Sequence, residues 1–176
     1  MGSLSVTSSN EKYWAGLGPM VAGAHFFPFP YAYRSPWDCD ADSFDDVAIQ
    51  QLEAYFETMG DTFAAAIIEP ITGEGGYIPA SSAFLKTLRR LCSERGILLI
   101  MDEIQSGFGR TGSWFNFHFH DVAPDIVVLA KGIASGMPLG ACVASKALME
   151  KWTTGAHGGT YGGNPICCAA GLATIN

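Results

Sequence analysis

Three ionisable residues each directly follow a run of five apolar residues: Glu69, Asp102 and Lys131. Short, fully apolar runs are typical of strands buried in a parallel sheet, and ligands bind such sheets at the carboxyl ends of their strands. A solvated charge at a strand end is the commoner interpretation of any one such residue alone. Because all three share this position, we expect their side chains to converge in one partly desolvated crevice.

The lysine and the aspartate together indicate a particular chemistry. A lysine held beside apolar residues can act as an amine nucleophile, and the natural covalent partner of an amine is an aldehyde. Asp102 would supply the fixed negative charge that keeps a pyridine nitrogen protonated, which is the pairing that a pyridoxal phosphate site needs. The sequence therefore predicts Lys131 as the catalytic residue and Asp102 as a cofactor-binding residue.

The surrounding sequence predicts alternating strands and helices, which is the pattern of an α/β layer with a mostly parallel sheet. Apolar residues recur at helical spacing in two stretches, with Ser43 or Asp45 as the predicted cap of the first and Gly96 as the stop of the second. Residues 16–37 are rich in Gly, Pro and aromatic residues and predict an irregular, covered segment. The predicted strands are 64–68, 97–101, 126–130 and 141–144, and the predicted helices are 45–59 and 81–95.

Length and composition narrow the class of protein. The 176 residues correspond to one ordinary domain, and a formal net charge of −7 argues against a general binder of nucleic acid or anionic membranes. The five cysteines are odd in number and lack a C-x-x-C spacing, so we expect a reduced, cytoplasmic protein without a metal site. The longest apolar runs are far shorter than the roughly 20 residues that span a bilayer.

Four stretches of the chain, in this order and at these separations, resemble the class III aminotransferases of fold type I. The resemblance is greatest to the 4-aminobutyrate, ornithine and other ω-amino-acid transaminases, and it covers most of the sequence. The matching stretches are Ile68–Gly76, Asp102–Gly112, Ala130–Gly132 and Gly158–Pro165.

This resemblance implies a role for five residues. Lys131 would form the internal aldimine with pyridoxal phosphate and then shuttle a proton, while Asp102 would pair with the pyridinium nitrogen. Gln105 would bond near the phenolic oxygen, and Thr160 would reach the phosphate of the neighbouring subunit's cofactor. Glu74 would be the substrate gate: it covers a substrate-binding arginine and releases it when a carboxylate arrives.

The resemblance also implies the larger assembly. Residues 1–176 would be the central part of a fold type I large domain. The phosphate-binding turn upstream, and a small C-terminal domain with the carboxylate-binding arginine, would lie outside them. The expected enzyme is a homodimer whose site is shared across subunits, and it moves an amino group from an ω-amino acid or related amine to a 2-oxo acid. We expect these residues alone to be poorly folded or inactive.

Two alternatives stay open at this point. Class III relatives include aminomutases and a decarboxylase, which need the same lysine. The second alternative is a truncated paralogue that pairs with a full-length subunit without catalysing a reaction. A nucleotide-binding Rossmann domain is disfavoured because no predicted strand is followed by G-x-G-x-x-G.

Other polar residues predict structural roles. We expect Glu69 to orient the loop that follows it, and we leave Glu103 as a lesser candidate. His118 and His120 are spaced like neighbours on a strand and predict packing or surface roles rather than metal binding. Arg110 predicts a structural or interface role.

Overall fold

A four-stranded sheet forms the centre of the molecule. The computed structural model describes residues 1–8 and 11–176. The strand order is β1-β4-β5-β6, in which β1, β4 and β5 are parallel and β6 runs antiparallel to β5. The predicted mostly parallel α/β sheet is confirmed. The strands are β1 (Ala65–Ile68), β4 (Leu98–Asp102), β5 (Ile126–Leu129) and β6 (Ala141–Ala144).

The register of this sheet aligns the carboxyl ends of its parallel strands. Ile68 of β1 pairs with Met101 of β4, and Asp102, the last residue of β4, pairs with Val128 of β5. Lys131 follows two residues after β5 ends. The three predicted residues therefore leave three adjacent strands at the same edge of the sheet.

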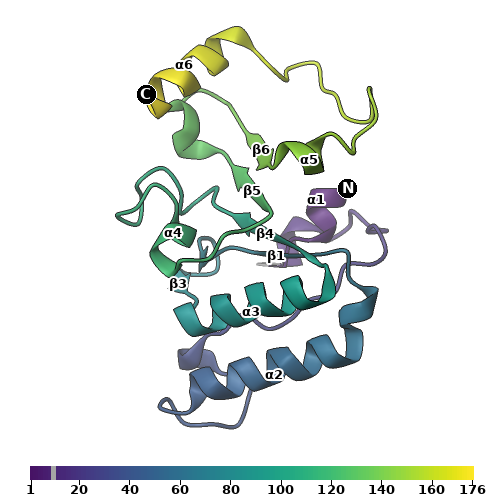
Figure 1. Cartoon of the computed structure of the whole chain (residues 1–176), viewed down its shortest axis with the longest axis vertical. Coiled ribbons are helices and arrows are strands. Elements are labelled where there is room, and N and C mark those ends of the chain that lie inside the picture. Colours follow the sequence, from purple (N-terminus) through teal and green to yellow (C-terminus); the bar gives the residue numbers. More distant parts are fainter. Residues whose placement is uncertain (9–10) are drawn as a thin grey trace.

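Two long helices form a layer on one side of the sheet (Figure 1). Helix α3 (Ser82–Arg95) packs on β4, and α2 (Phe44–Met59) packs on α3. The Ser81 hydroxyl accepts a hydrogen bond from the Phe84 amide (3.0 Å), and Gly96 ends α3 with φ of +67°, as a left-handed cap requires. The buried core between helices and sheet includes Ala48, Leu52, Phe56, Phe84, Leu85, Leu88, Cys92, Leu99 and Met101.

The predicted cap of α2 is wrong in its chemistry. Ser43 occupies the position before the helix, but its hydroxyl donates to the Asp40 carboxylate (2.7 Å) and accepts no helix N–H. Asp45 also serves another purpose, since its carboxylate accepts a hydrogen bond from Ser81 (2.6 Å). That bond ties the start of α2 to the start of α3.

The aromatic segment 16–37 is irregular, as predicted, and part of it covers the helices. Phe27 lies 5.4 Å from Tyr55 of α2 and 6.4 Å from Phe84 of α3 between ring centroids. Tyr33, in contrast, is 83% exposed. The segment therefore closes one flank of the core with some of its rings and leaves others at the surface.

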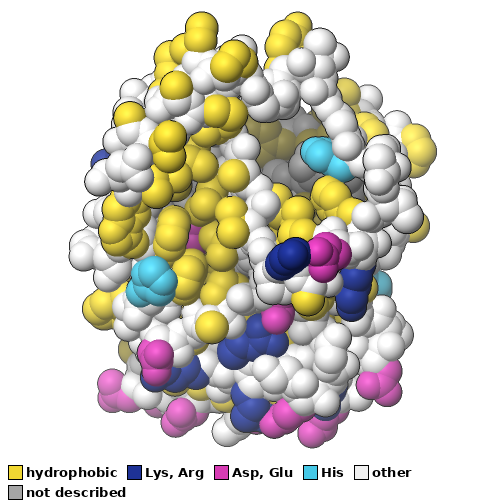
Figure 2. Space-filling view, turned by 45° about the horizontal axis from the view of Figure 1, so that its top comes forward, with side chains coloured by type: hydrophobic (Ala, Val, Ile, Leu, Met, Phe, Trp, Pro, Cys, Tyr) yellow, Lys and Arg dark blue, Asp and Glu magenta, His cyan; other side chains and the backbone are white. Residues whose placement is uncertain are grey.

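The strands are less buried than their apolar sequences predict. Ile67 of β1 is 46% exposed and Val143 of β6 is 49% exposed. Figure 2 shows hydrophobic side chains spread over the upper part of the surface, whereas charged side chains gather at the lower part, where α2 and α3 lie. Fully apolar strands indicate a sheet covered on both faces, but within the described residues the long helices cover one face.

Shorter elements connect these parts. The glycine-rich stretch after β1 forms a small antiparallel pair, and His118 and His120 lie in a short helix rather than on a strand, so that prediction is wrong. No helix among the described residues is long and apolar enough to cross a membrane. The remaining elements are α1 (Gly2–Ser5), η1 (Glu11–Tyr13), η2 (Ala32–Arg34), η3 (Gly60–Thr62), β2 (Ile71–Thr72), β3 (Ile78–Pro79), α4 (Asn116–His120), η4 (Lys131–Ala134), α5 (Lys146–Met149) and α6 (Pro165–Ile175).

Candidate active site

Lys131 lies on a tight turn at the carboxyl edge of the sheet. Its φ of +47° is in the left-handed region, which costs a non-glycine residue about 1 kcal/mol or more. A Cβ on the next residue, Gly132, would lie 3.1 Å from the Cβ of Phe108, so the turn is packed closely against that ring. The Lys131 Nζ donates a hydrogen bond to the Gln105 Oε1.

The expected desolvation of Lys131 is wrong for the described residues. Its side chain is exposed and lies beyond the carboxyl end of β5. The bond to Gln105, rather than burial, fixes the direction of the amine. A positioned amine at a strand end is nevertheless the geometry that a nucleophilic lysine requires.

Asp102 is a half-buried carboxylate beside this lysine. Burial raises the pKa of Asp102 above its usual range, while a hydrogen bond from the Ile104 amide (3.0 Å) and the positive charge of Lys131 lower it by less. The Ile104 amide and Lys131 therefore offset only part of the cost of burying the ionised Asp102 carboxylate. A protonated ring nitrogen is a group that would complete the compensation, so the site fits pyridoxal phosphate on this observation.

Glu69 leaves the strand next to that of Asp102, at the same edge of the sheet. Burial raises the pKa of Glu69, and the negative charge of Asp102 adds to that rise while Lys131 opposes it. The Glu69 Oε2 accepts a hydrogen bond from the Gly73 amide (2.8 Å), which orients the loop after β1 as predicted. A Cβ on Gly73 would come within 2.8 Å of the Gln105 Cγ, so this loop lies directly against Gln105.

Glu103, a lesser candidate from the sequence alone, anchors the loop that carries Gln105. Its carboxylate is fully buried and accepts hydrogen bonds from the Ser106 hydroxyl and from the Phe117 amide (2.9 Å). A buried carboxylate with such donors fixes the backbone around it. The apolar residues before Asp102-Glu103 indicated a strand end, but they could not show which carboxylate points into the core.

Glu74 lies at the surface and contacts residues far away in sequence. Its carboxylate accepts a hydrogen bond from the Tyr13 hydroxyl, and the Lys12 ammonium lies 3.6 Å from the same oxygen. The bond from Tyr13 lowers the pKa of Glu74, and it raises the pKa of Tyr13. Nothing in the sequence pattern singles out Tyr13, because no spacing links residues 61 positions apart.

Thr160 is not brought to these residues. It lies in the exposed stretch between α5 and α6, and among the described residues no hydrogen bond joins it to Lys131, Asp102 or Gln105.

Arg110 is exposed. His120 is buried and bonds to Ser82 (2.7 Å) and Asn116 (3.0 Å), which is the packing role that the sequence predicted.

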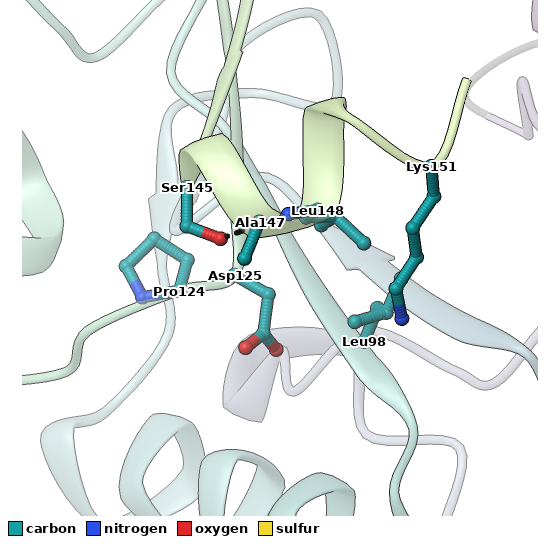
Figure 3. A pocket seen from close by; sticks show the side chains of 7 residues that line it. All are labelled: Leu98, Pro124, Asp125, Ser145, Ala147, Leu148 and Lys151. Atoms are coloured by element: carbon teal, nitrogen blue, oxygen red, sulfur yellow. Dashed lines mark hydrogen bonds between the residues drawn. The ribbon is translucent and has the colours of Figure 1, made fainter. Parts of the chain in front are cut away.

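A cavity of about 340 Å³ lies at the opposite edge of the sheet (Figure 3). Leu98 and Asp125 lie at the starts of β4 and β5, and Ser145 follows antiparallel β6, so the cavity is at the amino ends of the parallel strands. Ligands of such sheets bind at the other edge. This cavity is therefore separate from the candidate site.

The family follows from comparison with known proteins. The model of the family described as "Aminotransferase class-III" matches residues 1–176. The chain belongs to the class III aminotransferases. Pyridoxal phosphate is the cofactor of this family.

Named relatives and solved structures agree with this family. The chain is 37% identical to a probable 4-aminobutyrate aminotransferase of Bacillus subtilis over 99% of its length, and 42% identical to a 2-aminoadipate transaminase of Pseudomonas putida, also over 99%. A PLP-bound amine transaminase from an uncultivated Pseudomonas species matches 99% of the chain with a TM-score of 0.89 and 40% identity. The chain spans 40% or 41% of the length of each of these three proteins.

Proposed function

We propose that this chain is the core of a pyridoxal-phosphate-dependent transaminase that moves an amino group from an ω-amino acid or related amine to a 2-oxo acid. The observation that carries the proposal is the convergence of Lys131, Gln105 and Asp102 at one edge of the sheet. The Lys131 amine bonds to Gln105, and its charge acts on the Asp102 carboxylate.

Each residue has a defined task in this reaction. When bound, pyridoxal phosphate withdraws electrons from the carbon that carries the amino group. Asp102 would hold the proton on the ring nitrogen, because a nearby anion favours a cationic partner. Gln105 orients the Lys131 Nζ by accepting its hydrogen bond. The free amine of Lys131 would take a proton from the substrate carbon at Nζ and deliver it again from the same atom.

Two further residues complete the proposed site. Glu74 would act as the substrate gate by covering or releasing an arginine of the small domain, and a guanidinium so released can take a carboxylate bidentately. Thr160 would reach the phosphate in a neighbouring subunit of a homodimer. Its exposed position, without a bond to Lys131, Asp102 or Gln105 in the described part of the chain, is compatible with a role outside its own crevice.

Transfer of an amino group is favoured over the alternative reactions. Both relatives described above are named as transaminases, and the matched structure is named as an amine transaminase. An aminomutase or a decarboxylase would use the same lysine, so the site geometry does not distinguish them. The names of the relatives are the observation that favours transamination.

Reductive labelling tests the proposal directly. The active protein that carries this chain is incubated with pyridoxal phosphate, reduced with borohydride and digested, and we expect the peptide containing Lys131 to carry the mass of the reduced cofactor. Lys131→Ala should remove the label and all measurable transamination. Lys146→Ala is the matched control, because its side chain is 87% exposed and lies in α5, away from the crevice. Labelling of another lysine would overturn the assignment.

A further inference from the structure

The contact of Glu74 with Tyr13 is a tertiary contact between two separate segments. Glu74 lies in the turn between β2 and β3, whereas Tyr13 ends the short helix η1. The Tyr13 hydroxyl donates to Glu74 Oε1, and the Lys12 ammonium is 3.6 Å from that oxygen. Two donors from one segment therefore meet a single carboxylate from another.

The same carboxylate is coupled to the crevice. The positive charge of Lys131 acts on Glu74, and the negative charge of Glu74 acts on Glu69. Glu74 directly follows Gly73, where a Cβ would lie 2.8 Å from the Cγ of Gln105, the residue that accepts the hydrogen bond from Lys131. Its backbone neighbour Gly73 is buried against Gln105, so the turn itself is fixed while the Glu74 side chain is exposed.

A carboxylate that leaves a guanidinium needs new donors. An ionised group that gives up a charge-assisted hydrogen bond without replacing it becomes less stable. This rise in free energy would oppose opening of the gate. Tyr13 and Lys12 supply the donors that such a released carboxylate requires. Both groups contact the Glu74 carboxylate in this structure.

We propose that Tyr13 is a positioning residue that receives Glu74 when the gate is open and thereby sets the preference for substrates that carry a carboxylate. This inference rests on the proposed transaminase function and on the gate role of Glu74. Loss of the Tyr13 hydroxyl would remove a donor from the open arrangement alone. Glu74 would then pair more often with the arginine, and carboxylate substrates would bind less well.

The test compares two substrates in the active holoenzyme that carries this chain. For Tyr13→Phe we expect the KM for 2-oxoglutarate to rise about tenfold, the effect of one hydrogen bond to a charged group. The KM for 1-phenylethylamine, which has no carboxylate, should stay within about twofold of the unchanged protein, and kcat should change little. A general loss of structure would instead alter both substrates together.

Two further variants provide the controls. Tyr77→Phe removes a hydroxyl from a tyrosine that lies in the same turn region and is 70% exposed, and we expect no change in either KM. In a Glu74→Gln background, Tyr13→Phe should add little to the KM for 2-oxoglutarate, because the charged acceptor is already gone.

The outcomes separate this inference from the proposed function. If Lys131 is labelled and Glu74→Gln changes the KM for 2-oxoglutarate, but Tyr13→Phe does not, only the role of Tyr13 is overturned. If Glu74→Gln leaves that KM unchanged, the gate and the role of Tyr13 are both wrong while the transaminase function stands. If Lys131 carries no label, the proposed function itself fails.

Discussion

Two aspartates at opposite edges of the sheet have opposite environments. Asp102 ends β4 at the carboxyl edge, where burial raises the pKa of its carboxyl group. Asp125 precedes β5 at the amino edge. Burial would raise its pKa too, but hydrogen bonds from Arg89 and from the Leu99 amide, both 2.7 Å, outweigh burial and lower it.

The difference separates a structural carboxylate from one that is a candidate for binding a ligand. Asp125 joins α3, β4 and β5 through its partners, so its charge is compensated by the folded chain itself. Asp102 is held in place by one backbone amide, and its charge is less well compensated. A group that the fold positions but does not satisfy is a candidate for binding a ligand of opposite charge.

The largest effect is expected from Asp102→Asn. Removing the charge that would hold the ring nitrogen protonated should lower kcat/KM about 100- to 1000-fold, the usual effect of a missing electrostatic partner. The free energy of unfolding should not fall, because the ionised carboxylate is poorly compensated in the folded state. Steady-state kinetics and urea denaturation measure the two effects. Asp125→Asn is the control. An equal loss of activity in that variant would contradict the assignment of different roles to Asp102 and Asp125.

Asp125→Ala tests the structural aspartate. Its removal takes away the acceptor for both Arg89 and the Leu99 amide, so we expect the free energy of unfolding to fall by about 1–3 kcal/mol. Urea denaturation measures this loss. Asp42→Ala, at an exposed position, should change stability by less than about 0.5 kcal/mol. If Asp125→Ala unfolds with the same free energy as the unchanged protein, the hydrogen bonds of Asp125 make no net contribution to stability.

The pH dependence of stability should have opposite signs at the two sites. The lowered pKa of Asp125 means that its contribution is present above its ordinary value of 3.8 and is lost as pH falls through the folded-state pKa. The raised pKa of Asp102 means that its ionised form costs stability at neutral pH, and that this cost disappears as pH falls toward 3.8.

Thermal unfolding of the two Asn variants between pH 7 and pH 3 measures this difference. Asp125→Asn should be less stable than the unchanged protein at neutral pH, and Asp102→Asn should be equal or more stable. Both differences should shrink as the pH falls. Curves with the same sign at pH 7 would contradict the comparison.

The smallest effect is expected from Glu69→Gln. The amide oxygen of glutamine can still accept the hydrogen bond from Gly73, so the loop after β1 should keep its position. We expect kcat/KM to fall less than about tenfold, because an ordinary hydrogen bond contributes about 1 kcal/mol. Glu69→Ala, which removes the acceptor, is the comparison variant. A loss near that of Asp102→Asn would instead give Glu69 a direct role in the chemistry.

Much of the central layer was predictable because its signals are local. Ser81 and Gly96 mark both ends of α3, and the apolar run before Asp102 marks a strand and its exit edge. These patterns depend on residues within one element. The convergence of Glu69, Asp102 and Lys131 followed from the single rule that parallel strands end at one edge.

The other features depend on contacts between elements. The buried direction of Glu103 is set by donors 3 and 14 residues further along the chain, and the partner of Glu74 lies 61 residues away. The exposure of Lys131 depends on which other segments pack around the end of β5. Neither residue type nor spacing carries this information, so these features required the three-dimensional structure.

The packing of Gly132 against Phe108 has a consequence for how the site tolerates change. A methyl group at Gly132 would push on a ring whose own residue also has a positive φ, of +57°. Phe108 packs against the buried cluster of Leu129, Ile133 and Ala134, so its side chain has little room to move away. The Phe108 side chain thus limits the space available to the turn, and Phe108→Ala should allow the backbone at Lys131 and Gly132 to move.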